Sequence, residues 1–124
     1  MTEAEILVAV RVALGREPDL VLWRNSVGLA NQGRHRTRYG LCRGSADLVG
    51  IGPGGVFVAW ELKAGRGHLT PEQARFLLLV TARGGHARVI RSVDDARQAL
   101  DDLRNRARNL APARQPDAAT RQAD

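Results

Sequence analysis

The sequence has a single cysteine, few aromatic residues and no long apolar run. One cysteine, Cys42, excludes a disulfide within the chain, and the three histidines lie too far apart to make a zinc-binding pattern. Aromatic residues are 4% of the chain, so we expect a core of leucine, valine, alanine and isoleucine. No apolar run approaches the roughly 20 residues that span a membrane. The acidic, amphipathic N-terminus does not fit a secretory signal. We therefore expect a soluble intracellular protein.

Lysine is as scarce as cysteine. Lys63 is the only lysine, and all the other residues counted in the 19 Lys+Arg are arginines. This suggests that Lys63 has a task that a guanidinium performs poorly, such as donating from a compact ammonium beside an attacking water. The net charge of +6 and the pI near 11.1 predict a polyanionic partner. Nucleic acid is the first expectation and a membrane surface the weaker one. The 124 residues suffice for one domain with one core.

The chain is organised around residues 56–63, which predict a buried strand that ends in two opposite charges. Because side chains on a strand alternate between faces, one face is entirely apolar and the other ends in Glu61 and Lys63. Ionised groups at the end of an apolar strand need a reason, since burying an unpaired charge is costly. Two explanations stay open: a structural ion pair at the strand end, and a functional site.

A second carboxylate is predicted beside this pair. Residues 46–51 favour a strand that carries Asp47, and the tight turn at residues 52–55 joins it to residues 56–63 as an antiparallel hairpin. Asp47 is near the start of its strand and Glu61 near the end of the next, so both lie at the same end of the hairpin. The hairpin is therefore expected to gather two carboxylates and one ammonium.

A first helix is predicted over residues 2–14, where Thr2 and Glu5 fit a capping box. Glu3 falls on the inward-facing apolar stripe of this helix, whereas Glu5 points away from it. A carboxylate at that position lies either at the rim of the domain or in a site. We favour Glu3 over Glu5 as a possible site residue and leave the choice open.

The remaining elements complete an α/β pattern. A short strand is expected over residues 20–23, a helix capped by Thr70 and ending at Gly84-Gly85, a strand over residues 87–91, and a last helix beginning at Ser92. Gln73 completes a capping box with Thr70, and it also lies on the face of its helix that points toward the sheet. The domain is predicted to span residues 1–108, with a disordered tail over residues 109–124.

Residues 27–44 lose hydrophobic periodicity and gain positive charge, so we expect a long loop there. Basic residues interleaved with Tyr39 suit a phosphate backbone with one stacking contact, although a merely solvated loop would look similar. The candidates for phosphate contacts along the whole chain are Arg24, Arg34, Arg36, Arg38 and Arg66.

The ordered set of these motifs resembles a known family, the VRR-NUC (virus-type replication–repair nuclease) domain of the PD-(D/E)xK nuclease superfamily. The resemblance covers roughly residues 3–100. It rests on Glu3, Gly44-Ser45-Ala46-Asp47, Glu61-Leu62-Lys63 and Thr70-Pro71-Glu72-Gln73, with flanks at Trp23-Arg24-Asn25 and residues 84–92. At position 46 this chain has alanine, where the superfamily often has proline. The next residue, Asp47, which the resemblance implies as a metal ligand, is kept.

The resemblance implies a restriction-endonuclease-like α/β fold, with a small mixed central β-sheet flanked by helices in the order αβββαβ and a C-terminal helix. It implies that Asp47 and Glu61, with the Leu62 backbone carbonyl, bind Mg²⁺ or Mn²⁺, and that Lys63 orients or deprotonates the attacking water. Glu3 would reach the site through water or a second metal, and Gln73 would orient Lys63 or the water.

The expected activity is metal-dependent DNA endonuclease cleavage, with Holliday junctions or branched DNA as the first substrates to test. Standalone members of the family suggest a homodimer in the cytoplasm of a bacterial or phage-infected cell. The alternative from another class is a DNA-binding module that does not cut. Retention of Asp47, Glu61 and Lys63 disfavours that alternative. An RNA-binding or interaction protein has only the positive charge in its favour.

Overall fold

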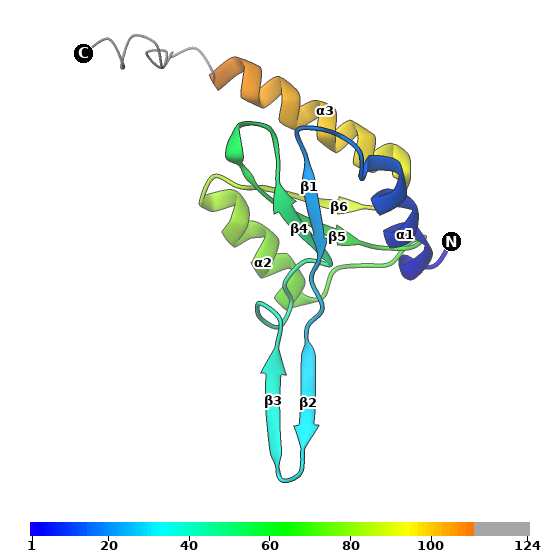
Figure 1. Ribbon diagram of the computed structural model, residues 1–124, viewed down its shortest axis with the longest axis vertical. Coiled ribbons are helices and arrows are strands. Elements are labelled where there is room, and N and C mark those ends of the chain that lie inside the picture. Colours follow the sequence, from blue (N-terminus) through cyan, green and yellow to red (C-terminus); the bar gives the residue numbers. More distant parts are fainter. Residues whose placement is uncertain (111–124) are drawn as a thin grey trace, which may run out of the picture.

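The computed structural model describes residues 1–110. In chain order its elements are α1 (Glu3–Leu14), β1 (Val21–Arg24), β2 (Gly28–Gln32), β3 (His35–Tyr39), β4 (Leu48–Ile51), a 3₁₀ turn (Pro53–Gly55), β5 (Phe57–Leu62), α2 (Pro71–Ala82), β6 (His86–Ile90) and α3 (Val93–Leu110) (Figure 1). With β2 and β3 set aside, this is the predicted order αβββαβ with a C-terminal helix. The last helix is longer than predicted and includes Asn109 and Leu110. The rest of the predicted tail, residues 111–124, lies outside the described residues.

The central sheet is mixed, as predicted. Its strand order is β1-β4-β5-β6, in which β1, β4 and β5 are antiparallel neighbours and β6 runs parallel to β5. The hairpin β4–β5 pairs Leu48 with Trp60 and Ile51 with Phe57. The parallel step needs a crossover, and α2 supplies it.

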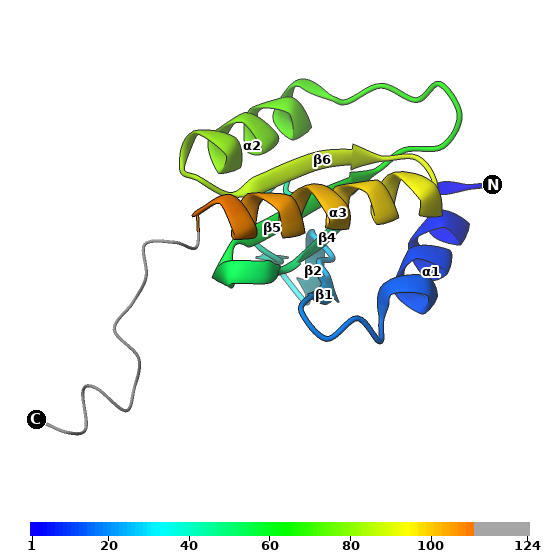
Figure 2. The same cartoon turned by 90° about the horizontal axis from the view of Figure 1, so that it is seen from above.

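Helices cover both faces of this sheet (Figure 2). On one face, α1 and α3 pack over the larger core, which is centred on the fully buried Trp60. The other face packs against α2 through small residues, Ala46, Ala59 and Ala87, together with Val80 of the helix. Because α2 meets only this smaller cluster, part of the second face stays open to solvent: Val21, Trp23, Ile51 and Phe57 are each exposed by roughly half.

The helix starts follow the predicted caps. Thr2 and Glu5 form a complete capping box on α1, and Thr70 and Gln73 form one on α2. The buried positions of α1 are Ile6, Val10 and Leu14, which recur at the spacing of one helical face. None of the helices in residues 1–110 has the length and apolar character needed to cross a membrane.

One expectation was wrong: residues 27–44 are not an irregular loop. β2 and β3 form an antiparallel ribbon joined by a two-residue turn, in which Gly33 has φ +64°, as the first position of a type II′ turn requires. Hydrophobic periodicity could not reveal this ribbon, because every residue of β3 and most of β2 is solvent-exposed. A strand without a buried face has no alternation of apolar and polar residues.

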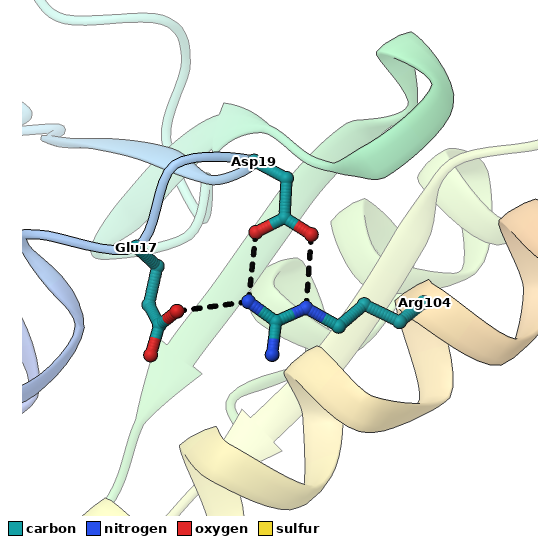
Figure 3. Close-up of polar contacts among 3 residues, drawn as sticks. All are labelled: Glu17, Asp19 and Arg104. Carbon is teal, nitrogen blue, oxygen red and sulfur yellow. Dashed lines mark hydrogen bonds and ion pairs between the residues drawn. The ribbon is translucent and has the colours of Figure 1, made fainter.

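A shared arginine ties α3 to the segment between α1 and β1. The guanidinium of Arg104 donates two hydrogen bonds to the carboxylate of Asp19, at 2.8 and 2.9 Å, and a third to Glu17 at 2.8 Å (Figure 3). These partners are more than 80 residues apart in sequence. The hydrogen bonds from Arg104 lower the pKa of Asp19. This cluster fixes the position from which β1 enters the sheet.

Candidate functional site

The hairpin β4–β5 brings Asp47 and Glu61 to the same end of the sheet. The last pair of residues in the register of these strands is Leu48 opposite Trp60. Asp47, which precedes Leu48, and Glu61, which follows Trp60, therefore occupy the next pair of opposite positions. The backbone N–H of Leu62 donates a hydrogen bond to Oδ2 of Asp47 at 2.9 Å. The carbonyl of a strand residue points to the same side as its N–H, so the Leu62 carbonyl faces the side on which Asp47 lies.

Glu61 is buried in an environment that disfavours its charge. Its side chain is only 2% exposed, and its Oε2 has no hydrogen-bond partner among the described residues. Burial above all, together with a hydrogen bond shared with Asp47 and the negative charge of Asp47, raises the pKa of Glu61 to about 9. The charge of Lys63 acts in the opposite direction. Two carboxyl groups held this closely compete for one proton or require a cation.

Lys63 lies beside Glu61 without forming an ion pair. It is 8% exposed, and its backbone N–H continues the sheet by donating to the Ile90 carbonyl at 3.1 Å. The ion pairs of residues 1–110 involve Arg75 and Arg104, not Lys63. The alternative of a simple Glu61–Lys63 ion pair therefore does not describe this strand end. The ammonium of a largely buried lysine without such a partner keeps its three donors for another ligand.

Glu3 reaches the same region from the first turn of α1. Its negative charge is among those that raise the pKa of Glu61. A Cβ on Gly67 would lie 3.6 Å from Cδ of Lys63 and 3.9 Å from Oε2 of Glu3, so both side chains border the loop that contains Gly67. Glu3 is exposed, which places it at the rim of the domain as well as near the site. Glu5 instead accepts a hydrogen bond from the N–H of Thr2 and serves the helix cap.

Gln73 forms no hydrogen bond with Lys63 within residues 1–110. Its side-chain oxygen accepts a hydrogen bond from the N–H of Thr70 at 2.9 Å, and its own N–H donates to the Thr70 hydroxyl. The capping role that the sequence indicated is therefore the one observed. Gln73 stays half-buried on the helix that covers this face of the sheet.

Sequence reasoning assigned no role to Asn25, which positions the segment before Asp47. Its backbone N–H donates to the Asp47 carbonyl at 2.8 Å, and its side-chain amide donates to the Ser45 hydroxyl and to the Ala46 carbonyl. The sequence signals were its place directly after a strand and within one of the flanks of the family resemblance. Gly44, with φ +87°, completes this support because its Cα approaches the backbone of Glu72, where a Cβ would clash at 2.7–2.8 Å.

Arg91 is a second residue with no assigned role. Its guanidinium donates hydrogen bonds to the carbonyls of Gly65 and Gly67 at 3.0 and 2.9 Å. These contacts hold the loop that follows Lys63, which also carries the exposed Arg66. Nothing in the sequence indicates this bond, since its partners lie 24 and 26 residues away.

A polar cavity of about 340 Å³ opens beside Asp47. Arg24, at the end of β1, and Tyr39, at the base of the β2–β3 ribbon, line it together with Asn25 and Leu7. Of the other predicted phosphate-binding residues, Arg34 is at the tip of the ribbon and Arg36 and Arg38 are on β3. The predicted basic residues therefore do not form one cluster. They extend from the cavity to the end of the ribbon.

The residues at this end of the sheet fit a hard divalent cation. The donors are carboxylate oxygens of Asp47 and Glu61, including the unpartnered Oε2, and the Leu62 carbonyl. No group of three or more Asp, Glu, His or Cys residues suited to a metal occurs within residues 1–110. Mg²⁺ nonetheless keeps several waters and needs only one or two carboxylates from a protein.

Comparison with known proteins adds no assignment, since no family model matches the chain and no curated protein is detectably similar to it. The resemblance to the VRR-NUC domain therefore stays a prediction from the motifs alone.

Proposed function

We propose that this protein is a DNA endonuclease that hydrolyses phosphodiester bonds with Mg²⁺ or Mn²⁺. The observation that carries the proposal is the convergence of Asp47, Glu61 and Lys63 at one end of the β4–β5 hairpin. A nearly buried lysine without an ion-pair partner in residues 1–110, next to two carboxyl groups that compete for one proton, is costly for stability. Such an arrangement is expected where a cation and an anionic substrate complete the charges.

Each residue has a role that its surroundings support. Asp47, Glu61 and the Leu62 carbonyl would hold the metal ion, which when bound polarises the scissile phosphate and stabilises the charge that develops on it. Lys63 donates hydrogen bonds that orient the attacking water. Arg24 and Tyr39 line the cavity beside Asp47 and suit the phosphate and base that flank the scissile bond. Asn25 and Arg91 keep the two loops of the site in place.

The proposed substrate is branched or junction DNA, and the proposed assembly is a homodimer. Support for self-association comes from the open part of the sheet, where Val21, Ile51 and Phe57 lie opposite one another on three neighbouring strands and are each nearly half exposed. Contiguous exposed apolar residues of this kind mark interaction surfaces. DNA would not cover these residues, because they carry no charge. The same uncharged surface of a second copy of the protein would cover them.

The decisive experiment is a cleavage assay on linear, flapped, nicked and four-way DNA, with Mg²⁺, with Mn²⁺ and with chelator. We expect cleavage only with metal, and faster cleavage of a branched substrate than of linear DNA. If the protein binds these DNAs but cuts none of them with either metal, the non-cutting DNA-binding module replaces the proposal.

A further inference from the structure

Residues 28–39, here called the arm, form a two-stranded ribbon that projects from the body of the protein (Figure 1). Within residues 1–110, β2 and β3 pair only with each other. A two-stranded hairpin alone in water is at best marginally stable. Leu29 and Tyr39 of the arm are 50% and 48% exposed. The arm therefore presents a surface whose order would be favoured by a partner.

The register divides the arm into two unlike faces. Leu29 is opposite Arg38 and Asn31 is opposite Arg36, and residues in such pairs share a face. We call these four residues the arginine face. The other face carries Tyr39, Thr37 and His35 with their partners on β2. Arg34 is in the turn at the tip. Two arginines on one face, with a third at the tip, make the arm strongly basic over a short length.

No acidic residue in the described part of the chain pairs with these arginines. Residues 20–46 contain five arginines and neither aspartate nor glutamate. Arg34, Arg36 and Arg38 make no side-chain hydrogen bond or ion pair with any residue in the described part of the chain. Exposed arginines without internal partners on a projecting ribbon are complementary to a polyanion.

The arm begins at the candidate site. Tyr39, the last residue of β3, lines the same cavity as Asp47, and Ser26 and Val27, which lead into β2, line it too. The nucleotides that follow a phosphate held beside Asp47 would therefore meet the base of the arm first.

Its dimensions select a class of nucleic acid. Each strand of the arm has five residues, so the arm is about 17 Å long at roughly 3.3 Å per residue. That length equals about half a helical turn of B-DNA, or roughly five base pairs. The major groove, about 12 Å wide, admits a two-stranded β-ribbon without distortion, whereas the minor groove of straight B-DNA, about 6 Å wide, must be widened to accept one, at a cost in deformation energy.

We propose that the arm lies in the major groove of duplex DNA next to the cleavage site, with the arginine face toward the base edges and the flanking phosphates. This rests on the proposed function, and it specifies the substrate further: one side of the scissile phosphate must carry about half a turn of intact duplex. The candidate site then determines which phosphodiester bond is cut, and the arm binds the adjacent duplex.

The test measures binding in chelator, so that it does not depend on cleavage. A labelled duplex is titrated with the wild-type protein, with Arg36→Ala/Arg38→Ala and with the control Arg83→Ala/Arg97→Ala, which removes the same charge from exposed positions outside the arm. We expect the arm variant to bind at least tenfold more weakly. The slope of log K against log salt concentration should be less steep by about 2, because two phosphate contacts are lost. The control should keep the wild-type slope.

Methylation protection locates the arm. Guanine N7 lies in the major groove, so on a duplex that ends in a fork the wild-type protein should protect guanines in a window of about five base pairs beside the fork, and the arm variant should not. A wild-type slope for the arm variant would overturn the inference. Protection of adenine N3 in the minor groove, or an equal loss of affinity for single strands, would do the same. If these effects appear but no DNA is cut with either metal, the proposed role of the arm in binding duplex DNA is supported and the proposed endonuclease activity is refuted.

Discussion

The indole nitrogen of Trp60 donates a hydrogen bond to Nδ1 of His86 at 3.2 Å, and both side chains are buried. The bond requires an unprotonated Nδ1, so protonation of His86 would break it and bury a charge. Burial above all, together with the positive charges of Arg88 and Arg106 and against the charge of Asp102, lowers the pKa of His86 to about 4.

We therefore expect His86 to lower the free energy of unfolding as the pH falls from 6.5 to 4, whereas Glu61, with its raised pKa of about 9, contributes a slope of the opposite sign down to pH 4.5. In that window the unfolded chain binds a proton at residue 86 and the folded chain does not, so the free energy of unfolding decreases by up to about 3 kcal/mol. Urea unfolding at pH 7, 6 and 5 measures this slope. His86→Gln should change the slope of the free energy of unfolding against pH by the loss of this one contribution, whereas His68→Gln, which alters an exposed histidine, should keep the wild-type slope. An unchanged slope in His86→Gln would remove the assignment.

The proposed chemistry predicts that Asp47→Asn and Lys63→Ala each lower the cleavage rate by at least about 10²-fold. Asp47→Asn removes a metal-binding charge, and Lys63→Ala removes the donor to the attacking water. DNA affinity in chelator should stay near wild type, because the exposed arginines carry the phosphate contacts. Single-turnover cleavage and fluorescence anisotropy measure the two quantities. Undiminished cutting by either variant would contradict the site.

Metal binding should be visible without any DNA. A ligand at ten times its dissociation constant stabilises the folded state by about 1.4 kcal/mol, which raises the melting temperature by roughly 5–10 °C for a domain of this size. We expect Mg²⁺ or Mn²⁺ to produce this shift in the wild-type protein and not in Asp47→Asn. Glu72→Gln, which alters a carboxylate on α2, is the matched control and should respond like the wild type. Equal shifts in all three proteins would mean that the metal binds elsewhere.

The Arg104 cluster is expected to contribute to stability through geometry as well as charge. Its side chain and those of Glu17 and Asp19 are each about one third exposed, so water screens their attraction. We expect Arg104→Leu to lose about 1–2 kcal/mol and Arg104→Lys about half as much, because lysine keeps the charge but cannot make the paired hydrogen bonds. Urea unfolding at low and high salt measures both losses. Full stability of Arg104→Lys would show that charge alone matters.

Self-association through the open sheet face can be tested separately. The wild-type protein should have twice the chain mass of 13.5 kDa in light scattering, and Ile51→Glu should have the mass of one chain because a carboxylate is costly to bury in an apolar contact. The melting curve of the variant shows whether it is folded. A monomeric wild-type protein would exclude the homodimer at this surface.

Local chemistry made most of the fold predictable. The capping residues Thr2 and Thr70 set the helix starts, the glycines after β4 set a turn, and alternation along residues 56–63 identified the central strand. The same hairpin logic was enough to predict that Asp47 and Glu61 lie together. The arm escaped prediction because neither of its faces is buried, and hydrophobic alternation reports only burial.

What the sequence determined by itself is therefore what depends on neighbours along the chain: the caps, the turns, the strand faces and the pairing of two carboxylates across a short hairpin. Tertiary structure alone decided which distant groups meet. It paired Trp60 with His86, Arg104 with Asp19 and Arg91 with the loop after Lys63, and it left Lys63 without an ion-pair partner among residues 1–110. The physical reason is that the energy of such contacts depends on burial and distance, which a linear pattern of residues does not contain.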